Sequence, residues 1–131
     1  LGDSLELAEM LSEAGIDFLH ISCWDCSWGS SEFPEDERTL TQWFSDRLGK
    51  SVPIISAGGI WSTSDAKAVM ANGADMVAVA RAAIGHADWA SHISEENYSP
   101  KKPPFSNQYL LEQGLSETFV DYMRGWDGFV A

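Results

Sequence analysis

Gly58 and Gly59 are adjacent, and they follow an apolar segment that ends at Ala57 and precede a helix-forming segment. Glycine allows positive φ and lets bare backbone amides approach an oxygen-rich ligand closely. Arg81 ends the next apolar segment, where a parallel sheet places its ligands. These residues predict a phosphate site made of backbone amides and one guanidinium. The alternatives are a tight turn that needs positive φ and, for Arg81, a salt bridge to a neighbouring loop.

Cysteine, histidine and acidic residues form weaker patterns. Cys23 and Cys26 have a spacing found in redox and metal sites, but the chain has two Cys in all and so no second pair. We interpret them as loop residues at the catalytic face, where Trp24 and Trp28 line the substrate entrance. His20 lies in an apolar segment and is interpreted as a hydrogen-bonded core residue; the alternative is that its side chain points to the ligand-binding side of the sheet.

The remaining titratable residues have structural interpretations. We expect His86 and His92 to face solvent, and Asp17 and Asp75 to accept hydrogen bonds from turn amides. The acidic run Glu35 to Glu37 precedes a helix-forming segment, so its charges suit the positive end of the helix dipole. We expect no metal at these residues.

Three short apolar segments alternate with helix-forming segments and must position the candidate site. Near-continuous apolar strands are typical of a parallel sheet covered on both faces. The pattern also repeats, because "EAGIDF" and "ANGADM" each join a helix end to a strand through Gly and Asp. We predict helices over 3–14 (with Leu7, Ala8, Leu11 and Ala14 on one face), 40–48 and 63–72, strands over 16–22, 52–57 and 75–80, and short helices over 107–113 and 117–124.

Composition limits the classes of function. The chain has 131 residues, 44% of them hydrophobic, and a net charge of -12. This is enough for one ordinary domain, and the acidic balance argues against a nucleic acid or an anionic membrane as partner. A small anionic ligand remains compatible, because backbone amides bind it locally. Without a signal or membrane-spanning pattern, we expect a cytoplasmic location.

The segment "VPIISAGGIWSTSDAKAVMANGADMVAVARAAIGHADW" resembles the old yellow enzyme family of NADH:flavin oxidoreductases. The strand residues "HIS" and the ending "GLSETFVDYMRGWDGFV" are also similar to that family. The resemblance implies an FMN site on a TIM barrel, with Ala57, Gly58 and Gly59 meeting the phosphate through backbone and with Ala80 and Arg81 completing the cradle. The family commonly has Gly where this chain has Ala80, whose methyl group narrows the space beside the phosphate.

The resemblance further implies an FMN-dependent NAD(P)H oxidoreductase (an ene-reductase) that reduces activated alkenes such as enones, with NADH or NADPH as hydride donor. It assigns residues 1–131 to the C-terminal segment of a single FMN-binding barrel, with βα units over 1–93 and a helical extension over 94–131. A complete TIM barrel has eight strands, and we predict three here. We therefore expect the remainder of the barrel or a second copy to be needed, and no residue is assigned a catalytic role.

Two other interpretations stay open. The first is another phosphate-binding TIM barrel, such as an FMN-dependent dehydrogenase of a different class or a sugar-phosphate enzyme. The second is a non-catalytic half-barrel that binds nothing.

Overall fold

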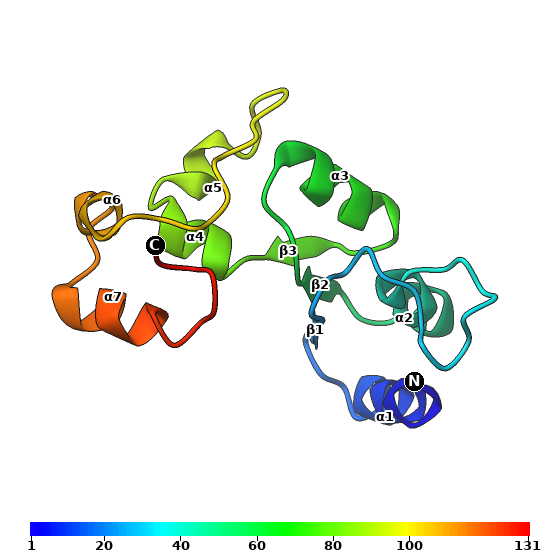
Figure 1. Cartoon of the computed structure of the whole chain (residues 1–131). Coiled ribbons are helices and arrows are strands. Elements are labelled where there is room, and N and C mark those ends of the chain that lie inside the picture. The colour runs from blue at the N-terminus through cyan, green and yellow to red at the C-terminus, as the bar shows by residue number, and fades with distance from the viewer. The chain divides into compact units, whose positions relative to one another are not determined.

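The computed structural model describes residues 1–131, which form two compact units (Figure 1). The first unit contains residues 1–60 and 64–78, and the second contains residues 61–63 and 79–131. The chain has no helix with both the length and the apolar character that a membrane crossing requires.

The first unit is built on a three-stranded parallel sheet with the order β1-β2-β3. This arrangement confirms the predicted α/β class, a portion of a TIM (β/α)8 barrel. The register pairs Ser22 of β1 with Ala57 of β2, and Ala57 with Ala78 of β3, so the carboxyl ends of all three strands are adjacent. Each strand is shorter than predicted, and the bounds are β1 Leu19–Ser22, β2 Ile54–Ala57 and β3 Met76–Ala78.

Helices α1 (Gly2–Glu13) and α2 (Leu40–Leu48) pack beside the strands, and α3 (Thr63–Ala71) joins β2 to β3 (Figure 1). The predicted helices are confirmed. The core is a cluster of buried apolar side chains from α1, α2, β1, β2 and the residues before β2, namely Ala8, Ile21, Leu48, Val52 and Ile54.

Two packing predictions are wrong. The buried face of α1 consists of Leu5 and Ala8, whereas Leu7 is 55% exposed and Leu11 and Ala14 are also exposed. The sheet is not covered on both faces throughout, because β1 buries Ile21 alone and Met76 in β3 is 45% exposed. The apolar content of a strand therefore overstates the burial that these residues reach within the first unit.

The repeated joint between helix and strand is confirmed. Gly15 after α1 and Gly73 after α3 both have positive φ, at 83° and 100°. At Gly73 a side chain is also sterically excluded, because a Cβ there would lie 2.1 Å from Oγ of Ser45. The two joints thus share a backbone conformation that glycine adopts without strain.

The second unit is helical, as predicted for its C-terminal part. Its core is the Phe105 ring, which has no exposed surface, stacks on Tyr109 and meets Phe129 edge to face. Ser106 and Ser116 cap the last two helices through their side-chain oxygens. The bounds are α4 Arg81–Gly85, α5 Trp89–His92, α6 Asn107–Glu112 and α7 Glu117–Met123.

The expectation that His86 faces solvent is wrong. Its side chain is buried, with Nε2 2.8 Å from the carbonyl oxygen of Lys101 and Nδ1 2.9 Å from the Tyr109 hydroxyl. A neutral ring satisfies both contacts when Nε2–H donates to the carbonyl and Nδ1 accepts from the hydroxyl. His86 is thus a structural residue of the second unit.

Candidate functional site

The paired glycines form a turn directly after the middle strand. β2 ends at Ala57, and the backbone then takes positive φ at Gly58 (136°) and at Gly59 (70°). The turn is half-buried, so it is reachable from solvent. The interpretation of the two glycines as a tight turn that needs positive φ is confirmed. These φ values would strain any residue with a Cβ.

The loop that follows β1 packs directly on this turn. The amide of Cys23 donates to the carbonyl of Ala57 at 2.8 Å, and the amide of Cys26 donates to the carbonyl of Gly58 at 3.1 Å. The Cys26 thiol donates to the same Gly58 carbonyl, with the sulfur 2.7 Å from the oxygen. A Cβ at Gly58 would lie 2.3 Å from the carbonyl oxygen of Cys23. Gly58 is therefore required for the approach of this loop.

A carboxylate occupies the corresponding space beside Gly59. A Cβ built on Gly59 would lie 2.7 Å from both Cγ and Oδ2 of Asp25. Asp25 is held there because its Oδ1 accepts from the amide of Ser27 at 2.9 Å and from the Ser27 hydroxyl at 2.6 Å. The carboxylate is half-buried, so its charge is only partly screened by water.

The backbone of the Gly58–Gly59 turn suits a phosphate group, but a neighbouring negative charge opposes one. No hydrogen bond within the first unit uses the amide of Gly59, which leaves this N–H available to an acceptor. Gly59 also adjoins the carboxylate of Asp25, however, and the negative charge of that carboxylate would repel a phosphate bound at the turn. The space that a Cβ would fill is taken by the loop, so the glycines are explained without a ligand.

The other two predicted phosphate residues lie in the second unit. Ala80 is the N-cap of α4 with φ -120°, and Arg81 is the first residue of that helix. Arg81 does not end a strand as predicted, because β3 ends three residues earlier at Ala78. Contact of Ala57, Gly58, Gly59, Ala80 and Arg81 with a phosphate stays a prediction.

The cysteine pair has little nucleophilic character. Both thiols are free, with Cys26 buried and Cys23 half-buried. Burial raises the pKa of Cys23 and that of Cys26, the latter to about 11, and the charge of Asp25 adds in the same direction. Because the thiolate is the reactive and metal-binding form, neither residue is prepared for redox or metal chemistry at neutral pH.

Four further residues were assigned from sequence. His20 is exposed in β1, so its interpretation as a core histidine is wrong. Asp75 accepts a hydrogen bond from the amide of Ile54, which begins β2, so its partner is a strand amide rather than a turn amide. Trp24 and Trp28 belong to the loop that follows β1, and their side chains are 68% and 56% exposed. Their role at a substrate entrance stays a prediction.

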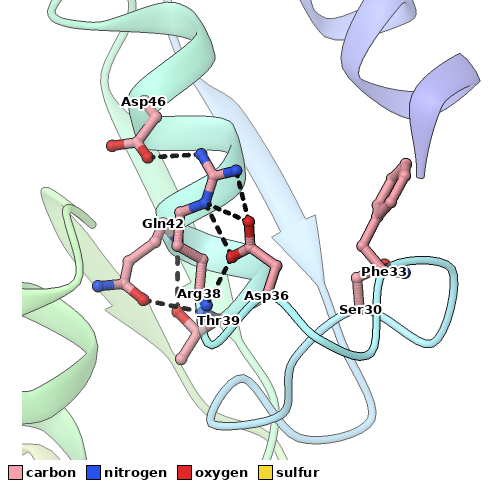
Figure 2. A network of polar contacts seen from close by, with 7 residues as sticks. All are labelled: Ser30, Phe33, Asp36, Arg38, Thr39, Gln42 and Asp46. Carbon is pink, nitrogen blue, oxygen red and sulfur yellow. Dashed lines mark hydrogen bonds and ion pairs between the residues drawn. The ribbon is translucent and has the colours of Figure 1, made fainter.

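A polar network connects the residues before α2 to side chains of that helix (Figure 2). The Arg38 guanidinium binds Asp36 at 2.9 Å and Asp46 at 3.0 Å, and its Cζ lies 3.5 Å from the centre of the Trp43 ring. The helix starts at Thr39, whose hydroxyl accepts from the amide of Gln42 while the Gln42 side chain accepts from the amide of Thr39. Within the acidic run Asp36 binds Arg38, whereas Glu35 and Glu37 are exposed, and the match of their charges to the helix dipole stays a prediction.

Beside this network lies an open hollow of about 460 Å³, lined by Glu32, Phe33, Pro34, Glu35, Asp36 and Trp43. Acidic groups around an aromatic ring are suited to a cation. Here the chain's own Arg38 already takes the position over the Trp43 ring. The Trp43 ring is therefore already in contact with an internal cation.

Consecutive parallel strands joined by helices, with a glycine turn at their carboxyl end, define the class as an α/β-barrel protein. Residues 1–101 match the family model described as "Histidine biosynthesis protein", a TIM-barrel family, and the chain belongs to that family. This is a different family from the old yellow enzymes that the sequence resembles.

Curated relatives carry two kinds of name. The chain is 31% identical over 128 residues to the probable NADH-dependent flavin oxidoreductase YqiG of Bacillus subtilis, and this alignment covers 95% of the present chain and 34% of YqiG. It is 32% identical over 96 residues to the NADH:fumarate oxidoreductase of Klebsiella pneumoniae, covering 70% and 10%. It is 33% identical over 96 residues to the imidazole glycerol phosphate synthase subunit HisF of Campylobacter lari, covering 72% and 35%. The chain thus spans about a third or less of each of these three relatives.

Proposed function

We propose that this chain supplies the FMN-phosphate site of an NAD(P)H:flavin oxidoreductase of the old yellow enzyme type. The observation that carries the proposal is the Gly58–Gly59 turn at the carboxyl end of the parallel sheet, with the amide of Gly59 unused within its unit. Ligands of parallel α/β folds bind at this end of the strands. The names of two relatives support NADH, and the name of one of them supports a flavin.

The proposed residues have separate roles. The backbone of Ala57, Gly58 and Gly59 meets the phosphate, with the amide of Gly59 as a donor, and Ala80 and Arg81 contribute a further amide and a guanidinium. When bound, FMN supplies the hydride chemistry, which belongs to the cofactor rather than to this chain. The proposed whole enzyme takes hydride from NADH or NADPH and reduces an activated alkene such as an enone. Fumarate, in the name of one relative, is an alkene activated by two carboxyl groups.

The test compares FMN with riboflavin, which carries the same ring without the phosphate. Flavin fluorescence is titrated with the purified protein, and we expect tighter binding of FMN. R81A should weaken binding of FMN and leave riboflavin unchanged, whereas K102A removes an exposed positive charge and should change neither. Equal affinities for FMN and riboflavin in the wild-type protein would contradict the proposal.

The second candidate is a phosphate-binding barrel enzyme without flavin. The matching family model and the HisF relative favour it, because imidazole glycerol phosphate in the relative's name is itself a phosphate ester. Binding of inorganic phosphate without any binding of FMN or riboflavin, together with a purified protein that lacks a flavin absorption band, would select this candidate.

A further inference from the structure

Asp25 lies against the residue whose amide would meet the phosphate. We infer that Asp25 is an affinity-determining residue of the Gly58–Gly59 turn: its carboxylate weakens binding of dianionic phosphate, so that a free phosphate ion is rejected and a ligand needs a second binding group such as a flavin ring. The inference rests on the proposed flavin site. It names a residue of this chain that acts against the phosphate rather than one that binds it.

The position of the carboxylate is fixed by the fold. The loop that carries Asp25 is hydrogen-bonded to the turn on both sides, through Cys23 to Ala57 and through Cys26 to Gly58. Within the loop, Ser27 donates two hydrogen bonds to Oδ1 of Asp25. A rotation of the side chain away from Gly59 would therefore break these bonds. The carboxylate stays beside the turn unless the loop itself moves.

The charge of Asp25 already acts on its neighbours. Burial raises the pKa of the Cys23 thiol and that of the Cys26 thiol, and the charge of Asp25 raises both further. The charge of Asp25 therefore disfavours a negative charge at both sulfurs. A phosphate dianion at the turn carries two negative charges and experiences the same repulsion more strongly. Within the first unit, the amide of Gly59 opposes this repulsion with one hydrogen bond.

The matched variants are D25N and D17N. D25N removes the charge and keeps an amide oxygen that can accept from Ser27. D17N also removes one acidic charge, so the net charge of the protein changes equally in the two variants. Asp17 is exposed on the amino side of β1, whereas Asp25 follows the carboxyl end of that strand. Fluorescence titration gives the dissociation constants for FMN and riboflavin, and calorimetry gives the constant for inorganic phosphate.

We expect D25N to bind FMN and inorganic phosphate about tenfold more tightly than wild type, with riboflavin unchanged and with D17N behaving as wild type. The gain should shrink in about 0.5 M salt, because the electrostatic screening length is then roughly 4 Å. If wild type prefers FMN to riboflavin and D25N shows no gain, the inference is overturned and the proposed function stands. If neither protein prefers FMN to riboflavin and neither binds phosphate, both are overturned.

Discussion

Replacing Gly58 by alanine tests how closely the loop after β1 packs on the turn. The new Cβ would lie 2.3 Å from the carbonyl oxygen of Cys23, 2.8 Å from its carbon and 3.3 Å from the amide nitrogen of Asp25. All three are backbone atoms, so no side chain can rotate away to relieve the clash. The turn and the loop must separate, which also weakens the hydrogen bond from Cys26 to Gly58.

Two energies contribute to the expected loss. Positive φ at a residue with a Cβ costs about 1–2 kcal/mol, and overpacking against fixed neighbours costs about 1–3 kcal/mol. We therefore expect G58A to lower the free energy of unfolding by about 3 kcal/mol, a large part of the 5–15 kcal/mol typical of a domain. Gly49 is the control: its φ is 59° and no atom lies within 4 Å of a Cβ there. G49A should lose about 1 kcal/mol, from backbone strain alone.

Urea unfolding followed by circular dichroism and by tryptophan fluorescence measures both variants. The two signals should give the same midpoint if the transition is two-state. Equal losses in G58A and G49A would refute the reasoning, because they would show that the loop does not contact the turn. A loss confined to G58A with retained FMN binding would instead separate the packing role of the glycine from the proposed ligand role.

Three other perturbations have defined outcomes. F105A removes a ring with no exposed surface and should destabilise the second unit by about 3–5 kcal/mol, whereas F119A, at a ring 39% exposed, should change stability by less than about 1 kcal/mol in the same urea assay. Cys26 has a pKa raised to about 11 by burial, so its alkylation by iodoacetamide at pH 8 should be much slower than that of a free cysteine, and a fast reaction would contradict the buried position. The protonated His92 ring donates hydrogen bonds to the carboxylates of Glu95 and then of Asp88, which raises the pKa of His92, so E95Q should lower the pKa measured by NMR titration. The protonated ring paired with these ionised carboxylates stabilises the fold below the unfolded-state pKa of histidine, and this contribution is lost as pH rises through the folded-state pKa.

Local patterns in the sequence were sufficient for the order of the helices and strands in the first unit. The parallel strands, the helices that join them and the two Gly-Asp joints follow from apolar runs and from glycines whose positive φ the structure confirms. Side-chain environment was predicted less well. His20 and Leu7 are exposed and His86 is buried, because burial depends on which elements pack together and not on the apolar character of the neighbouring sequence.

The glycine turn shows why the candidate site could be located but not fully described from the sequence. Paired glycines after a strand indicate a turn with positive φ, and the structure contains one. The atoms that exclude a side chain there belong to Cys23 and Asp25, and the Cys26 thiol that donates to Gly58 is 32 residues away in the chain. No local pattern reports a contact at that separation. The same contact changes the chemistry of the turn, because it places a carboxylate beside an amide that would otherwise be open to any anion. A search for phosphate sites by glycine pairs alone therefore finds candidate donors and misses the neighbouring charge that, in the proposed site, would limit what they bind.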